Sequence, residues 1–208
     1  MRRLVYYVAT TIDGFIAEPD RGDPTGRASF PVTDDVVRFI VETYPETLPA
    51  AVRAALGIDD PGRSFDTVLE GRGSYEVGLA AGVTDAYPHL RHLVFSSTLS
   101  GTPDPAVELV VGDAVERVRE LKREPGLDLW LVGGGGLAHS LLPEIDRLVL
   151  KVTPAVIGAG VPLFDGPFTP HSFHPTEEIR LPGGVRVVTY DRQAAADPAE
   201  TVEPAAGE

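Results

Sequence analysis

The chain has 208 residues, of which 31 are acidic and 18 are basic, so its formal net charge is -13 at pH 7. This charge opposes that of a nucleic-acid backbone, which proteins neutralise with clustered lysine and arginine, and we expect no nucleic-acid partner. The chain contains no cysteine, which excludes disulfides, thiolate metal sites and cysteine nucleophiles. Its content of 43% hydrophobic and 24% charged residues is typical of a globular protein with a buried core.

The sequence shows no targeting or membrane segment. The apolar run at residues 4–9 is too short for the core of a signal peptide, and no stretch approaches the length of a membrane-spanning helix. We therefore predict a cytoplasmic protein without a membrane partner. Residues 1–192 are predicted to form one domain. Residues 193–208 are acidic, lack basic residues and are predicted to be a disordered tail.

Strand-like and helix-like patterns alternate along most of the chain. Residues 4–9 are rich in β-branched and aromatic side chains and predict a central strand, and Thr33 is the predicted N-cap of the first helix. A second short helix ends at Gly57. Further strands are predicted at 66–69, 91–95, 107–111, 129–132 and 147–152, and further helices at 74–81, 113–122 and 137–142. Alternation of this kind indicates a parallel sheet with helices on both faces.

The last predicted element has a different pattern. Residues 173–180 and 185–190 predict two strands joined by a tight turn that contains Gly183 and Gly184. Two strands connected in this way are antiparallel. The predicted fold class is therefore α/β, with a mostly parallel central sheet of about eight strands that ends in an antiparallel hairpin.

Four consecutive glycines at residues 133–136 follow a predicted strand and precede a predicted helix. Backbone N–H groups at the start of a helix attract anions, and glycine lets a pyrophosphate approach the backbone closely. A turn that needs positive φ, or a close contact between helix and sheet, is the other interpretation of this run. The dinucleotide fingerprint Gly-x-Gly-x-x-Gly is missing from the first strand–helix unit, and no lysine follows the glycines as in a Walker loop.

Two more polar turns follow predicted strands. In the first, Arg72 could pair with a phosphate while Ser74 caps the next helix and offers its hydroxyl. The second carries the hydroxyls of Ser96, Ser97 and Thr98, which suit phosphate or ribose oxygens. A solvated arginine, a simple cap and an ordinary turn explain the same residues. All three turns lie at the carboxyl ends of predicted parallel strands, where open α/β sheets bind ligands, so one anionic ligand could contact all of them.

Two side chains are candidates for contact with a substrate. Lys151 is the single lysine in an apolar strand and could meet a phosphate, a carboxylate or a keto oxygen. The alternative is a lysine that extends its amine to solvent at the sheet margin. Asp35 lies in the first turn of a helix, where the helix dipole favours acidic residues in any case. His171 and His174 lack a telling spacing for metal ligands, and we assign no metal.

Five groups of motifs follow one another along the chain, at residues 12–17, 71–76, 95–97, 131–135 and 146–164. They resemble, in this order, the motifs of the dihydrofolate-reductase-like fold. The nearest branch is the riboflavin-biosynthesis reductase C-terminal-domain family, and the resemblance covers about residues 3–191. It implies an NADPH-dependent reductase that transfers hydride to a small heterocyclic or carbonyl substrate, such as a pyrimidine or a pteridine, and that forms a homodimer. A non-catalytic protein that binds a nucleotide or another small molecule is the alternative.

The resemblance also implies roles for individual residues. Arg72 and Ser97 would face the adenosine 2′-phosphate, Ser74 and the amides of residues 134–137 the pyrophosphate, and Ala9 and Ile16 the nicotinamide. A cis peptide would join Gly133 and Gly134. Asp35 stands roughly where folate reductases keep their pterin-binding acid, whereas Ala138 and Lys151 replace a tyrosine and a threonine of those enzymes, which argues against folate. The predicted catalytic residues are Asp35 and Lys151, and the predicted cofactor-binding residues are Ala9, Ile16, Arg72, Ser74, Ser96, Ser97, Gly133, Gly134, Gly135, Gly136 and Leu137.

Overall fold

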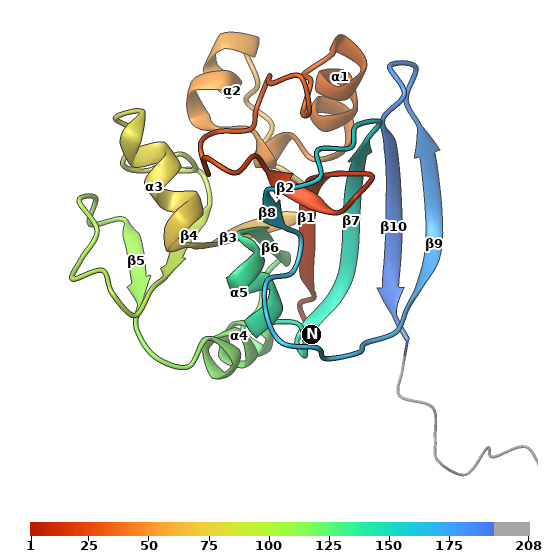
Figure 1. Cartoon of the computed structure of the whole chain (residues 1–208). Helices are drawn as coiled ribbons and strands as arrows, with labels where there is room; N and C mark the ends of the chain where they lie inside the picture. Colours follow the sequence, from red (N-terminus) through yellow and green to blue (C-terminus); the bar gives the residue numbers. More distant parts are fainter. Residues whose placement is uncertain (194–208) are drawn as a thin grey trace, which may run out of the picture.

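The computed structural model describes residues 1–193, and its centre is an eight-stranded sheet (Figure 1). The strands of this sheet are β1 (Leu4–Thr11), β3 (Phe65–Gly71), β4 (Arg91–Phe95), β5 (Val107–Val110), β6 (Asp128–Gly133), β7 (Ile145–Thr153), β9 (Phe173–Arg180) and β10 (Arg186–Arg192). Their order is β5-β4-β3-β6-β1-β7-β10-β9. The first six strands in this order run parallel, and β10 is antiparallel to both of its neighbours. The predicted α/β sheet with a terminal hairpin is confirmed.

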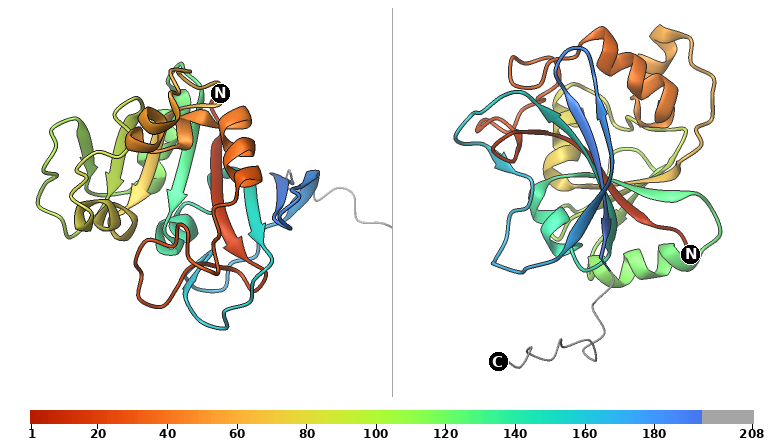
Figure 2. Two further views of the ribbon diagram at one scale, coloured as in Figure 1. Left: turned by 90° about the horizontal axis from the view of Figure 1, so that it is seen from above. Right: turned by 90° about the vertical axis from the view of Figure 1, so that its right-hand side faces the viewer.

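Helices cover both faces of the sheet. They are α1 (Asp34–Thr43), α2 (Ala50–Leu56), α3 (Arg72–Ala80), α4 (Ala114–Arg123) and α5 (Gly135–Ser140), with a 3-10 helix, η1 (Pro45–Thr47). The right-hand view of Figure 2 shows α1 and α2 on one side of the sheet and α4 on the opposite side. None of the helices in the described part of the chain has the length and apolar character that a membrane crossing needs.

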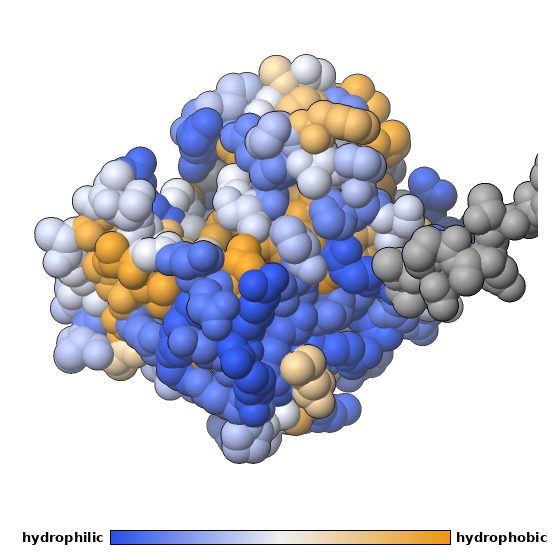
Figure 3. Space-filling model, turned by 90° about the horizontal axis from the view of Figure 1, so that it is seen from below, coloured by the Kyte–Doolittle hydropathy of each residue, from blue (hydrophilic) through white to orange (hydrophobic). Residues whose placement is uncertain are grey.

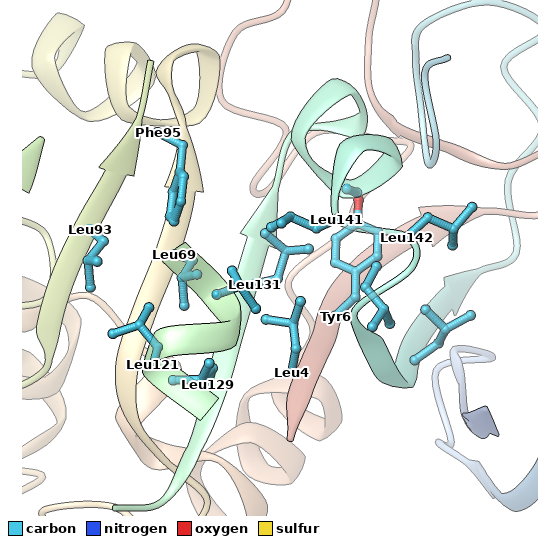
Figure 4. Packing of buried hydrophobic residues seen from close by; sticks show 14 residues of the cluster. Leu4, Tyr6, Leu69, Leu93, Phe95, Leu121, Leu129, Leu131, Leu141 and Leu142 are labelled. Carbon is cyan, nitrogen blue, oxygen red and sulfur yellow. The ribbon is translucent and has the colours of Figure 1, made fainter. Parts of the chain in front are cut away.

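Strand β1 is buried on both faces, which explains its continuous apolar sequence. Side chains alternate along a strand, so Leu4 and Tyr6 enter one core with Leu121 of α4 and with Leu141 and Leu142, which follow α5 (Figure 4). Val5 and Tyr7 enter a second core on the other face, where Phe39 of α1 packs. The outer side of α4 is charged, and the face of the molecule shown in Figure 3 is largely hydrophilic.

Two short strands are absent from the prediction. β2 (Phe15–Ala17) and β8 (Val161–Pro162) pair antiparallel as a separate two-stranded sheet. With three and two residues they are too short for an alternating pattern, and they are held by pairing between segments far apart in the sequence. Thr33 occupies the predicted N-cap position of α1, but its side chain makes no capping hydrogen bond. The predicted tail lies, except for Gln193, outside the described residues.

Candidate functional site

The structure brings three parts of the predicted cofactor site together around Gly133, at the end of β6. A Cβ atom at Gly133 would lie 3.6 Å from Ile16 Cδ1, 3.8 Å from Ser74 Oγ and 3.8 Å from Tyr6 Oη. These side chains belong to β2, α3 and β1. The peptide bond between Gly133 and Gly134 is cis, as the resemblance implied. Residues separated by more than a hundred positions thus meet where neighbouring strands end.

Two helices begin beside each other at this point without a capping side chain. α3 follows β3 with Gly71 as its N-cap, and α5 follows β6 with Gly134 as its N-cap. A Cβ atom at Gly71 would lie 3.6 Å from the backbone nitrogen of Gly134, so the two helix starts are adjacent. The first backbone N–H groups of a helix have no partner within that helix. The backbone N–H groups at the starts of α3 and α5 therefore fit an anion such as a diphosphate.

The glycines of the run differ in what surrounds them. A Cβ atom at Gly136 would meet nothing within 4 Å, and one at Gly134 would meet only Ser74 Oγ, at 4.0 Å. Gly135 is different, because a Cβ atom there would collide with the backbone oxygen of Pro162 in β8. Gly135 is therefore required for close packing, whereas Gly134 and Gly136 leave open space. The close contact between helix and sheet is found at Gly135, and anion binding at Gly134 and Gly136 stays a prediction.

The structure corrects the predicted capping role of Ser74. α3 begins at Arg72, two residues earlier than predicted, because β3 continues to Gly71 and the extended Gly71 (φ -82°, ψ 163°) is the N-cap. Ser74 lies in the first turn instead, and its side chain makes no hydrogen bond within residues 1–193. Its hydroxyl points toward Gly133 and Gly134 and is available to a ligand.

Arg72 and the turn after β4 form one polar cluster. Arg72 Nη1 donates a hydrogen bond to Thr98 Oγ1 over 2.7 Å, and Arg72 Nε lies 3.5 Å from Glu76 Oε1. Ser96 Oγ accepts hydrogen bonds from the backbone N–H groups of Thr98 and Leu99, so it also shapes the turn. Ser97 is exposed, as are the side chains of Arg72 and Glu76. This cluster offers an exposed guanidinium beside hydroxyl groups, which suits a phosphate.

Lys151 lies on the other side of the candidate site, in β7. It pairs in register with Ala9 of β1, the residue predicted to flank the nicotinamide. Its Nζ lies 3.5 Å from the centre of the Tyr7 ring, and the half-buried side chain forms no ion pair within residues 1–193. Burial lowers the pKa of Lys151 to about 7. The amine is thus able to gain or lose a proton near neutral pH.

Asp35 has a different environment. Its Oδ2 accepts a hydrogen bond of 2.6 Å from the backbone N–H of Gly183, in the turn between β9 and β10. The hydroxyl of Thr33 and this N–H group lower the pKa of Asp35, which keeps the carboxylate ionised at neutral pH. Asp35 and Lys151 form no ion pair in the described part of the chain. The catalytic roles of both residues stay predictions.

Two residues of the site are missing from the predicted set. Thr98, which binds Arg72, lies in the same turn as Ser96, so the hydroxyl cluster already indicated it. The ring of Tyr7 contacts the Lys151 amine. Strand alternation places the Tyr7 side chain on the same face of β1 as Ala9. Within residues 1–193, no three or more His, Asp or Glu side chains are arranged so that they could hold a metal ion.

Comparisons with known proteins identify relatives of the whole domain. YwjB of Bacillus subtilis (strain 168) is 27% identical over 184 residues, which cover 88% of this chain and 90% of YwjB. Dihydrofolate reductase from Enterococcus faecalis, solved with NADP(H), has a TM-score of 0.62 and 15% identity over 92% of this chain and 97% of its own. A Thermotoga maritima protein described as a diaminohydroxyphosphoribosylaminopyrimidine deaminase and 5-amino-6-(5-phosphoribosylamino)uracil reductase has a TM-score of 0.59 and 18% identity, over 92% of this chain and 57% of its own.

The two solved structures confirm the dihydrofolate-reductase-like fold that the ordered motifs predicted. The family comparison covers almost the same part of the chain as those motifs. Residues 2–177 match the RibD C-terminal domain. The chain therefore belongs to the RibD C-terminal domain family.

Proposed function

We propose that this protein is an NADPH-dependent reductase that transfers hydride to a small heterocyclic or carbonyl substrate. The observation that carries the proposal is the convergence around Gly133, where Ile16, Ser74 and two uncapped helix starts lie together. Membership of the RibD C-terminal domain family supports it, as does the same fold in a dihydrofolate reductase solved with NADP(H).

The chain's own residues would bind the cofactor by its charged groups. Arg72 and the hydroxyls of Ser96, Ser97 and Thr98 would hold the 2′-phosphate, since this cluster combines an exposed cation with hydroxyl donors. The backbone N–H groups at the start of α5 and the Ser74 hydroxyl would hold the diphosphate. The bound cofactor supplies hydride, and the protein supplies position and exclusion of water.

The substrate would bind beside Ala9, where Lys151 stands on the neighbouring strand. Because the Lys151 amine has no carboxylate partner among residues 1–193, it is able to donate a hydrogen bond or a proton to a substrate oxygen or ring nitrogen. Asp35 is ionised at neutral pH and would orient a substrate N–H group rather than donate a proton.

The deciding experiment combines binding and turnover. NADPH should raise the melting temperature of the protein, and absorbance of the reduced cofactor should fall in the presence of pyrimidine, pteridine or carbonyl substrates. Binding without oxidation by any of these compounds would favour a non-catalytic nucleotide-binding protein. Absence of stabilisation by NADPH would overturn the cofactor assignment.

We further propose that the protein acts in the cytoplasm as a homodimer. Both proposals come from the sequence and from the family resemblance. Light scattering on the full chain measures the mass in solution, and a mass of one chain at working concentration would contradict the dimer. Cell fractionation with an antibody to the chain tests its location.

A further inference from the structure

A buried histidine in β4 lies between two carboxylates, and none of the three residues belongs to the candidate cofactor or substrate site. His92 is 1% exposed, and its Nε2 lies 2.6 Å from Glu70 Oε1 while its Nδ1 lies 2.8 Å from Asp85 Oδ1. Both carboxylate side chains are only 7% exposed. A neutral imidazole has one N–H donor, whereas the protonated ring has two and is able to donate to both carboxylates.

The other groups that face His92 carry no charge at neutral pH. The rings of Tyr75 in α3 and Tyr87 in the following loop contact the imidazole edge-on, with centroids 6.0 and 5.8 Å away. Burial raises the pKa of both tyrosines, so they remain protonated. Burial alone would lower the pKa of His92, but the hydrogen bonds and charges of Glu70 and Asp85 outweigh it and raise this pKa.

This charged group is connected through β3 to the turn that carries Arg72. Glu70 immediately precedes Gly71, the N-cap of α3, and pairs in register with Val94 of β4 and Gly133 of β6. His92 is the second residue of β4 and pairs in register with Val68, and β4 ends at Phe95, just before Ser96. The ion pair therefore joins the end of β3, from which the Arg72 turn departs, to the start of β4, whose other end leads to the Ser96 turn.

We propose that protonated His92 is a positioning residue for the cofactor: it fixes the end of β3 against β4 so that Arg72 and the Ser96 turn face one phosphate group. This inference rests on the proposed function. Without its proton, the ring would turn a lone pair toward one buried carboxylate, and the repulsion would move that side chain from its present position. NADPH affinity therefore falls as the pH rises through the pKa of His92.

Thermodynamic linkage between NADPH binding and protonation of His92 gives a direct test on the unmodified chain. If protonated His92 favours NADPH, bound NADPH must raise the pKa of His92. Nuclear magnetic resonance of the protein with ¹⁵N-labelled histidine follows all five histidines as the pH rises, with and without NADPH. We expect an increase of about half a unit or more for His92. His89, whose Nε2 contacts the backbone oxygen of Glu46, is the control for a general effect of the cofactor charge.

The variant His92→Gln separates positioning from stability. Glutamine retains a hydrogen-bond donor without the charge, so we expect NADPH binding about tenfold weaker at about pH 6 and nearer to wild type at about pH 9. The phosphate of NADPH also titrates near pH 6 and changes the affinity of both proteins. The contribution of His92 is therefore the difference in NADPH affinity between variant and wild type at each pH. The variant His89→Gln should bind like wild type.

The outcomes are distinct. If NADPH stabilises the wild type but the pKa of His92 does not change, His92 has only a structural role and this inference is wrong. The same conclusion follows if His92→Gln melts at a lower temperature yet binds NADPH with unchanged affinity and pH dependence. If the variant does not fold, the histidine titration of the wild type decides. If the wild type does not bind NADPH, the proposed function fails first, and this inference fails with it.

Discussion

The Nζ atom of Lys151 lies 3.5 Å from the centre of the Tyr7 ring, across two neighbouring strands of the central sheet. The Tyr7 hydroxyl is buried and has no hydrogen-bond partner within residues 1–193, and burial raises its pKa well above the ordinary value. The ring is therefore neutral and offers the amine only its π face. A substrate group beside Ala9 would be the first polar partner of this amine.

The first prediction concerns the pH dependence of the proposed reduction. Because burial lowers the pKa of Lys151 to about 7, donation of a proton by Lys151 should make kcat/KM fall as the pH rises above that value. Lys151→Met should lower kcat/KM by roughly 10² to 10⁴ and remove this part of the pH profile. A profile that keeps its shape in the variant would show that another group donates the proton.

A second prediction uses the fact that the chain has only two lysines, Lys122 and Lys151. Lys122 lies 2.7 Å from Asp146 Oδ2 and donates a hydrogen bond to the backbone oxygen of Glu144, so its amine is occupied by protein partners. At about pH 7.5, an amine-directed acylating reagent should modify Lys151 faster than Lys122, since only the neutral amine is nucleophilic. Peptide mass spectrometry measures both sites in one sample. Equal labelling rates would contradict the assigned environments.

Arg72 provides a test of the phosphate cluster. Arg72→Ala should weaken NADPH binding about tenfold to hundredfold, because a charge-assisted hydrogen bond is lost, and should change NADH binding little. Titration calorimetry with both cofactors gives the ratio. The control is Arg63→Ala, which removes an exposed arginine paired with Asp60 in a different loop. Equal losses for NADPH and NADH would rule out a role for Arg72 at the 2′-phosphate.

Local sequence patterns predict the main elements because each pattern reflects the burial of that element. β1 is apolar throughout because both of its faces are covered, and β10 follows a glycine-containing turn that requires a hairpin. The ordered motifs also indicated that Ile16, Ser74 and the glycine run share one site. Their contact around Gly133 agrees with that prediction.

Other features depend on distant partners and leave no local signal. His92 resembles an ordinary core residue of an apolar strand, because Glu70 and Asp85 reach it from other elements. The pairing of Ala9 with Lys151 depends on the register of β1 and β7, which shifts at an irregularity after Leu4. The position of Ser74 within α3 depends on where β3 ends. The sequence left this end open, because Gly71 and Gly73 are each compatible with the end of a strand or with a turn.

The glycine run gives a prediction that separates folding from binding. Gly134 has an extended backbone that any residue adopts, and its surroundings leave room for a side chain, so Gly134→Val should fold. The valine would fill the space proposed for the diphosphate, and NADPH should no longer raise the melting temperature. Gly135→Ala should instead lower the melting temperature without ligand, because its Cβ atom collides with β8. Gly136→Ala, an exposed helical position with open space, is the control and should stabilise the chain by up to about 1 kcal/mol. If Gly134→Val folds and still binds NADPH like wild type, the diphosphate does not lie at the start of α5.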